Sequence, residues 1–196
     1  SSPRTCIQRL LTADTRMSCF ACFSGLFGGK EKKELVKAKA LVKELIKAKS
    51  CGPILVRLAW HDSGTYDKAN ADKPWPEAGG TIYLGPIKNQ VPGVSWADLI
   101  QLGSATAIEM MGGPKIRMKY GRVDGNPKSP APPPFGLPDA LPPFGGPSPQ
   151  DPADHLRYVF YKYGMDDKDI VALSGAHTIG RAFKDRSGTV KEGYLN

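Results

Sequence analysis

Apolar residues recur at helical spacing in several stretches of this chain, with helix-ending residues between them. From residue 30 to 49 the apolar positions form one stripe and lysines occupy the opposite face, which predicts an amphipathic helix. Gly52-Pro53 ends this helix and begins an apolar one over 54–62, because proline is tolerated in a first helical turn. The stripe expected to be buried in the first helix is Leu35, Ala38, Leu41, Val42, Leu45 and Ile46.

The middle of the chain predicts an irregular segment followed by a third helix. Residues 64–94 are rich in Gly, Pro, Asn and Asp and read as irregular. Ser95, with Asp98 three residues later, is typical of a helix-capping pair, and we expect the helix to run to Gly112-Gly113. Its buried side would consist of Leu99, Leu102, Ala105, Thr106 and Ile108.

A proline-rich stretch separates these helices from two shorter ones. Residues 126–152 contain eleven prolines, which exclude a regular helix or a central strand and predict an extended loop. Residues 154–163 and 166–176 predict two short helices, the second capped by Asp166. No strand-rich region follows from the pattern, so the expected fold class is all-α.

The net charge of +8 narrows the classes of partner. A basic chain can bind nucleic acid, an acidic surface or an anionic small molecule. The densest basic stretch is the amphipathic helix, and no nucleic-acid-reading motif accompanies it, so we expect no nucleic-acid partner. An anionic reductant or a protein partner fits the charge better.

The first 29 residues differ in composition from the rest. Residues 1–16 carry three Arg, several Ser and Thr and one acid, while residues 17–29 are uncharged. We expect residues 1–29 to be a leader or a surface-binding extension. Cys19 and Cys22 form one CxxC pair, which is more simply explained by small apolar residues than by a metal site, because a second ligand pair is missing.

Three histidines are present, and two of them are candidates for chemistry. We expect His155 to be an exposed polar residue near the start of its helix. His61 lies four residues after Arg57, so the two side chains share one face of an apolar helix. Such a pair can split a peroxide: the imidazole transfers the proton and the guanidinium stabilises the developing negative charge. A buried structural histidine would show the same spacing.

His177 follows an apolar helix and has small residues on both sides. Small neighbours allow a flat cofactor to approach the backbone, and a neutral imidazole there could bind haem iron. A histidine at the end of a helix can instead interact only with the helix dipole. Spacing alone leaves both interpretations open.

Longer sequence matches decide between them. The stretch RLAWHDSGTYDK resembles the distal-helix signature of class I haem peroxidases, and DIVALSGAHTIGRAFKDRSG resembles their proximal signature. Both are most similar to ascorbate peroxidases, in particular the chloroplast type. The residues GVSWADLIQLGSATAIEMMGGPKIRMKYGRVD, LPDA and DHLRYVFYKYGMDDKD extend the resemblance over most of residues 30–190.

The resemblance implies a role for each matching residue. Arg57 and His61 would be catalytic and His177 would bind the iron of haem b. The resemblance implies that four further residues line the haem, namely Trp60, Pro138, Leu173 and Ser174. It also implies ascorbate contacts from Lys49, Cys51 and Arg186, and a possible potassium ligand in Thr178.

Two features of the family are missing from this sequence. Family members have a helix carrying an Asn that bonds the distal histidine, whereas here Gly79-Gly80 leads directly into the next segment and Asn89 is in the wrong place. Family members also continue beyond the proximal histidine with an Asp bonded to it and a Trp beneath the haem, but only 19 residues follow His177. We therefore expect residues 30–196 to be a partial, truncated haem-peroxidase-like domain.

The expected function is reduction of hydrogen peroxide with ascorbate by a haem enzyme of the chloroplast stroma or thylakoid. One alternative is a catalytically impaired, peroxidase-derived interaction subunit of a chloroplast membrane complex, in which a protein partner covers the missing half. Another is a haem-binding sensor or carrier that uses His177 as the ligand.

Overall fold

The computed structural model describes residues 29–64, 66, 83–124, 137–139, 142–144 and 148–181. These residues form helices and connecting segments with no strand among them, which confirms the all-α class. None of the described helices is both long enough and apolar enough to cross a bilayer. The leader predicted at 1–29 lies almost entirely outside these residues, because only Gly29 is described, as the first residue of a helix.

The first three predicted helices are confirmed with small shifts at their ends. Helix α1 spans Gly29–Lys49, α2 spans Gly52–Ser63 with Pro53 in its first turn, and α4 spans Trp96–Met110. The predicted cap of α4 is present, since the Ser95 hydroxyl oxygen accepts a hydrogen bond from the Asp98 backbone N–H at 3.1 Å. The stretch expected to be irregular also contains a one-turn helix, α3 (Gly85–Lys88), which packs on α1. Its second residue is Pro86, whose ring favours helical φ.

The last two helices begin at local caps. Helix α5 spans Pro152–Lys162, and the Asp151 carboxylate accepts from two backbone N–H groups at its start. Helix α6 spans Asp167–Ser174 and begins with a reciprocal capping box between Asp166 and Asp169. A 3₁₀ turn, η4 (Gly175–Thr178), follows directly, so the α-helix expected over 166–176 ends two residues earlier, at Ser174, and His177 lies in the 3₁₀ turn. The described parts of the proline-rich loop contain no helix or strand before α5.

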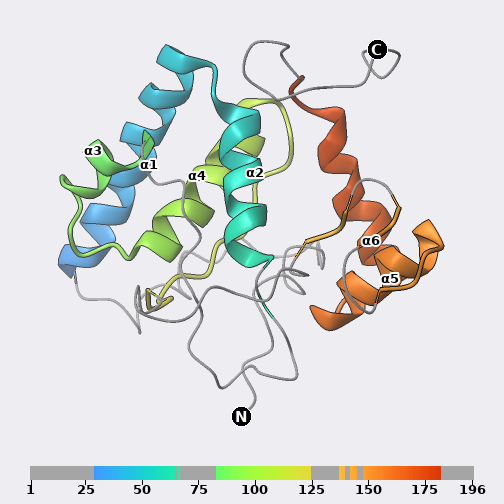
Figure 1. The fold of residues 1–196 in the computed structure, drawn as a ribbon. Coiled ribbons are helices and arrows are strands. Elements are labelled where there is room, and N and C mark those ends of the chain that lie inside the picture. Colours follow the sequence, from blue (N-terminus) through green and yellow to red (C-terminus); the bar gives the residue numbers. More distant parts are fainter. Residues whose placement is uncertain are drawn as a thin grey trace.

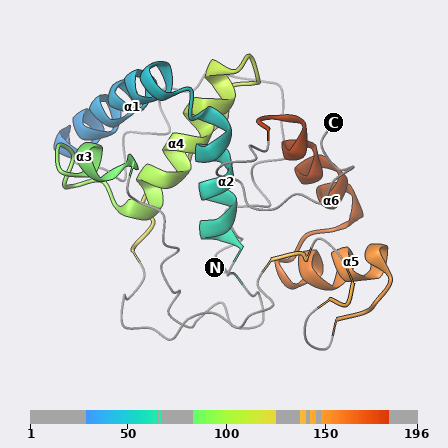
Figure 2. The ribbon, with the colours of Figure 1, turned by 45° about the horizontal axis from the view of Figure 1, so that its top comes forward.

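Two apolar clusters organise the described residues. The first cluster joins α1, α2, α4 and the segment around α3, and its buried members include most of the predicted stripes, for example Val42 and Leu99 at 0% exposure. The second cluster consists of Tyr66 and residues of α5, α6 and the turn between them. Helix α2 contributes to both, since Leu55 and Ala59 lie in the first and Trp60 packs against the second. Figures 1 and 2 accordingly show α2 (teal) between the α1–α3–α4 group and the α5–α6 pair.

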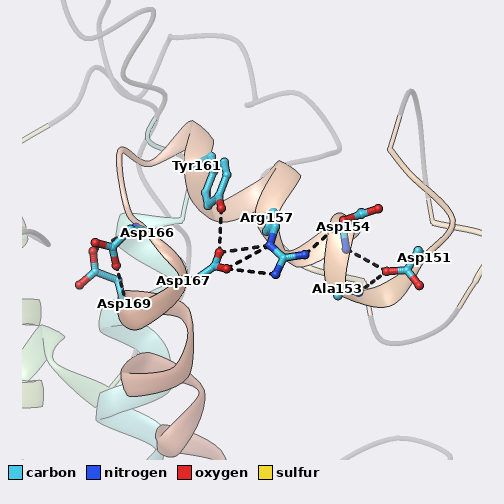
Figure 3. A network of polar contacts seen from close by, with 8 residues as sticks. All are labelled: Asp151, Ala153, Asp154, Arg157, Tyr161, Asp166, Asp167 and Asp169. Carbon is cyan, nitrogen blue, oxygen red and sulfur yellow. Dashed lines mark hydrogen bonds and ion pairs between the residues drawn. The ribbon is translucent and has the colours of Figure 1, made fainter.

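A polar network links α5 to α6 at the surface. The Asp167 carboxylate accepts hydrogen bonds from the Arg157 guanidinium at 3.0–3.2 Å and from the Tyr161 hydroxyl at 2.7 Å. Arg157 also contacts Asp154 at 3.3 Å, one turn earlier on its own helix. Figure 3 shows the Asp167 carboxylate between the two α5 side chains, so this network fixes the start of α6 against α5.

The prediction that His155 is exposed is wrong. Its side chain is 3% exposed and stacks on the ring of Phe144, with ring centroids 4.0 Å apart. Both ring nitrogens have hydrogen-bonding partners from the proline-rich loop, Ser148 and Asp139. The loop covers the first turn of α5, which the helical pattern of α5 alone does not reveal.

Candidate functional site

Helix α2 carries the residues predicted for the distal side of a haem. Leu55 and Ala59 are one turn apart and face α4, where Gly103 allows close approach: a Cβ built at Gly103 would lie 3.9 Å from the Leu55 methyl carbons. With this face packed, Arg57 is exposed and His61 is half-buried. The helix thus presents a cation and an imidazole one turn apart, away from its contact with α4.

The surroundings of His61 favour its neutral form. Partial burial lowers the imidazole pKa from its usual value of 6.5, and the positive charge of Arg57 lowers the pKa further. A neutral imidazole has a free lone pair at neutral pH and can accept a proton. The charge of Arg57 therefore acts on the imidazole one helical turn away.

A third polar residue supports this turn of α2 and was not singled out from the sequence. Gln101 on α4 is buried, and its side-chain amide donates to the Ala59 carbonyl oxygen at 3.2 Å and to the Ser63 hydroxyl at 3.0 Å. These two acceptors lie on either side of His61 in the sequence. The only signal available in the sequence was a single amide among the apolar residues of α4. Asn89, by contrast, is exposed at the end of α3, the short helix that packs on α1.

Trp60 connects α2 to α5. Its ring is half-buried and lies 5.4 Å from the Phe160 ring in a stacked arrangement and 5.8 Å from the Tyr163 ring in an edge-on arrangement. Leu173 of α6 packs against the same second cluster. The structure thus brings two of the residues predicted to line a haem to one apolar cluster, one from each histidine-bearing segment.

The segment carrying His177 runs beside α2 in the opposite direction. Leu173 and Trp60 pack against a shared cluster at one end. At the other end Gly180 meets Pro53, the second residue of α2: a Cβ added at Gly180 would lie 2.8 Å from the Pro53 Cβ. Figures 1 and 2 both show α6 (red) antiparallel to α2. His177 therefore belongs to a segment that is held at both ends along the helix carrying Arg57 and His61.

His177 itself is exposed, as are its neighbours Ser174, Gly175 and Thr178. A Cβ built at Gly175 would meet nothing within 4 Å, so the backbone before His177 borders open space. An accessible imidazole flanked by small residues, with the half-buried Leu173 nearby, is a donor that could hold haem iron. On these observations the residues present fit a haem.

The residues predicted to contact ascorbate differ in exposure, and one of them lies outside the described residues. Lys49 is exposed at the end of α1. Cys51 is buried immediately before α2, with its sulfur 3.9 Å from the Leu45 carbonyl oxygen, and burial raises the pKa of its thiol. Arg186 lies outside the described residues.

Pro138 and Thr178 were predicted to line the haem and to bind a cation, respectively. Pro138 is half-buried between Leu137, which packs against Gly64, and Asp139, which bonds to His155. The Thr178 hydroxyl donates to the Gly175 carbonyl oxygen at 2.7 Å. Across the described part of the chain, no group of three or more His, Cys, Asp or Glu side chains is arranged to hold a metal ion.

Comparisons with known proteins bear on both histidine segments. A family model described as Peroxidase matches residues 38–192. The chain is 49% identical over 177 residues to Probable L-ascorbate peroxidase 8, chloroplastic, of Oryza sativa subsp. japonica, covering 79% of this chain and 35% of that protein. It is 50% identical to Probable L-ascorbate peroxidase 7, chloroplastic, of the same plant, and 49% identical to L-ascorbate peroxidase T, chloroplastic, of Arabidopsis thaliana. It covers 47% and 39% of those two proteins.

The chain thus spans about a third to a half of the length of these relatives. The segment matched by the family model includes α2 with Arg57 and His61 and the η4 turn with His177. The region matched by the family model is most of the chain, and the similarity to the chloroplastic ascorbate peroxidases covers 79% of the chain. This chain belongs to the peroxidase family.

Proposed function

We propose that the chain forms the part of an ascorbate peroxidase that holds the haem between its distal and proximal histidines. The observation that supports this proposal is the antiparallel arrangement of α2, which carries Arg57 and His61, and the α6–η4 segment, which carries His177 (Figure 1). The relatives named ascorbate peroxidases support the substrate pair, hydrogen peroxide and ascorbate.

Each residue would have a distinct task. Bound haem would supply the iron at which the peroxide is reduced. His177 would hold the iron through one imidazole nitrogen. His61, neutral because of burial and Arg57, would accept a proton from the peroxide and return it to the leaving oxygen. The Arg57 guanidinium would stabilise the negative charge that develops on that oxygen.

Reduction of one hydrogen peroxide to two waters takes two protons and two electrons. Ascorbate would supply the electrons in the proposed function, and Lys49 and Arg186 would attract this anion. Cys51 is only 8% exposed. It would therefore contact ascorbate through its backbone, or through its thiol only after a local opening. A potassium ion at Thr178 remains part of the proposal on the basis of the resemblance alone.

The names of the relatives support a chloroplast location, in the stroma or on the thylakoid. We propose that residues 1–29 act as a leader or surface-binding extension and that residues 30–196 form the haem-peroxidase-like domain. The alternative of an interaction subunit in a chloroplast membrane complex has no support from the described residues or the comparisons, and we do not propose it.

Haemin titration of the purified chain, followed at the Soret band, tests the proposal. We expect saturable binding in the wild type and its loss in His177→Ala. Lys168→Ala, an exposed change on α6, is the matched control and should bind as the wild type does. Peroxide-dependent oxidation of ascorbate by the loaded chain would then test the substrates. Equal binding by His177→Ala and wild type would contradict the assignment of the ligand.

A further inference from the structure

His155 is a buried titratable residue that the proposed chemistry does not use. It lies in the first turn of α5 and is 3% exposed. A buried imidazole loses its contacts with water, so its polar atoms need partners within the protein. His155 has a partner at each ring nitrogen, and both partners come from the proline-rich loop.

The two hydrogen bonds assign the tautomer. The Asp139 backbone N–H donates to Nε2 of His155 at 2.9 Å, so Nε2 must carry a lone pair. The proton of the neutral ring is therefore on Nδ1, which lies 2.5 Å from the Ser148 hydroxyl oxygen and donates to it. The ring face is covered by Phe144, whose plane is within 3° of parallel. The acceptor nitrogen, the donor N–H and one face of the His155 ring thus each have a partner in the proline-rich loop.

The bond to Asp139 fixes a segment that matters for the haem pocket proposed above. Asp139 follows Pro138 and Leu137, and a Cβ built at Gly64 would overlap the Leu137 side chain, which shows how closely Leu137 packs against the end of α2. Residues 137–139 therefore connect the helix carrying His61 to His155 on α5. Within the same loop, the Gln150 amide donates to the carbonyl oxygens of Phe144 and Ser148, two residues that contact the ring of His155.

We propose that His155, as the neutral Nδ1–H tautomer, is a positioning residue that holds residues 137–139 against the end of α2 and thereby sets the position of Pro138 at the haem. This inference rests on the proposed function. An imidazole suits the task because it offers an acceptor and a donor at opposite edges of one flat ring. Either amide side chain reproduces only one of the two edges.

The tautomer and the contact can be tested without haem. Long-range ¹H–¹⁵N spectra of the wild-type imidazole should show the proton on Nδ1, and the Asp139 amide should exchange slowly with solvent. A proton on Nε2 would overturn the proposal, as would an Asp139 amide that exchanges as fast as an exposed one. These measurements need no variant and do not depend on the outcome of the haemin titration.

Three substitutions then separate the two edges of the ring. His155→Gln can place its side-chain oxygen near the position of Nε2 and keep the bond to Asp139. His155→Asn can reproduce only the bond to Ser148, and His155→Phe keeps only the stacking on Phe144. In His155→Asn and His155→Phe we expect the Asp139 amide to exchange, and haemin to dissociate, about tenfold faster, the scale of one lost buried hydrogen bond. His155→Gln should be close to wild type in both.

If Asp139 exchange and haemin dissociation became faster to the same extent in all three variants, His155 would have a general packing role and the proposal would be overturned. Haemin binding equal to wild type in all three variants would overturn it as well. Helical circular dichroism identifies any variant that has not folded, in which case the tautomer and exchange of the wild type decide. A wild-type chain that binds no haemin overturns the proposed function and the role toward haem with it. The Asp139 amide in that experiment still reports whether His155 holds residues 137–139.

Discussion

The side-chain amide of Gln101 on α4 donates a hydrogen bond to the backbone carbonyl oxygen of Ala59 on α2 at 3.2 Å. The same amide reaches the Ser63 hydroxyl at 3.0 Å. The last turns of α2 are therefore tied to the core of the first cluster by polar contacts as well as by packing. His61 lies between these two acceptors in the sequence, so Gln101 supports the part of the helix from which its imidazole extends.

Replacement of Gln101 by Leu should lower the free energy of unfolding by about 1–3 kcal/mol. The Ala59 carbonyl oxygen and the Ser63 hydroxyl would lose the amide that donates to them, while the side-chain volume would be nearly kept. Urea unfolding followed by circular dichroism measures this loss. Gln90→Leu is the control: Gln90 is exposed and its side-chain amide donates to the nearby Pro86 carbonyl oxygen at 3.3 Å, so we expect a change below about 0.5 kcal/mol. Equal losses in the two variants would contradict a special role for the buried amide.

The lowered pKa of His61 predicts where the rate of the proposed peroxide reaction declines at low pH. In the proposed function the neutral imidazole is the reactive form, so the reaction rate should decline at a lower pH than it would for an imidazole with the usual pKa of 6.5. Arg57→Gln removes one cause of the lowering and should move this decline to higher pH, besides slowing the reaction. Stopped-flow mixing of the haem-loaded chain with peroxide measures both effects.

The same shift has a consequence for stability with a definite sign. Below pH 6.5 the unfolded chain binds a proton at His61 more readily than the folded chain does, so the contribution of His61 to stability falls as pH decreases through the folded pKa. His61→Gln should flatten that part of the pH–stability profile. An unchanged profile would show that the imidazole titrates alike in both states.

Trp60→Ala should loosen the contact between α2 and the second cluster. The ring contacts Phe160 and Tyr163 from a half-buried position, so we expect a loss of about 2–3 kcal/mol, below the range for a fully buried aromatic residue. Trp60→Phe keeps an aromatic ring and should recover about half of this loss. Urea unfolding of the two variants gives the comparison, and a loss in Trp60→Phe as large as in Trp60→Ala would argue against ring stacking as the cause.

The network between α5 and α6 should respond to acid. Hydrogen bonds from Arg157 and Tyr161 lower the pKa of Asp167 from its usual value of 3.8. The stabilisation by Asp167 is thus present above pH 3.8 and is lost as pH falls through the lower folded pKa. Because these side chains are exposed, salt should weaken the effect. Asp167→Asn should flatten the acid part of the stability profile, whereas Lys168→Ala should leave its shape unchanged.

Local sequence patterns predicted most helix boundaries. Ser95 and Asp166 were identified as caps because a cap depends on a side chain and a backbone N–H within the same turn. The apolar stripes of α1 and α4 were identified for a related reason, since residues three and four apart share a helix face. The short helix α3 was missed because one turn is too short to show a period.

Contacts between distant segments were harder to predict. His155 was expected to be exposed because its own helix gives no sign of the loop residues Ser148 and Asp139 that cover it. Gln101 was overlooked because its acceptors lie on another helix. The two histidine segments were recognised through resemblance to a family, while the contact of Gly180 with Pro53, which places one segment along the other, had no local signal.

The membership of α2 in both apolar clusters has a consequence for how the chain unfolds. Helices α5 and α6 share one cluster and α1 and α4 share the other, and Trp60, Leu55 and Ala59 join the two from a single short helix. Partial unfolding reported by hydrogen exchange should therefore follow two units whose coupling depends on α2. If α2 opens, both units lose a packing surface at once. The helix proposed to carry the proton-transfer pair would then also determine whether the chain melts in one cooperative transition or in two.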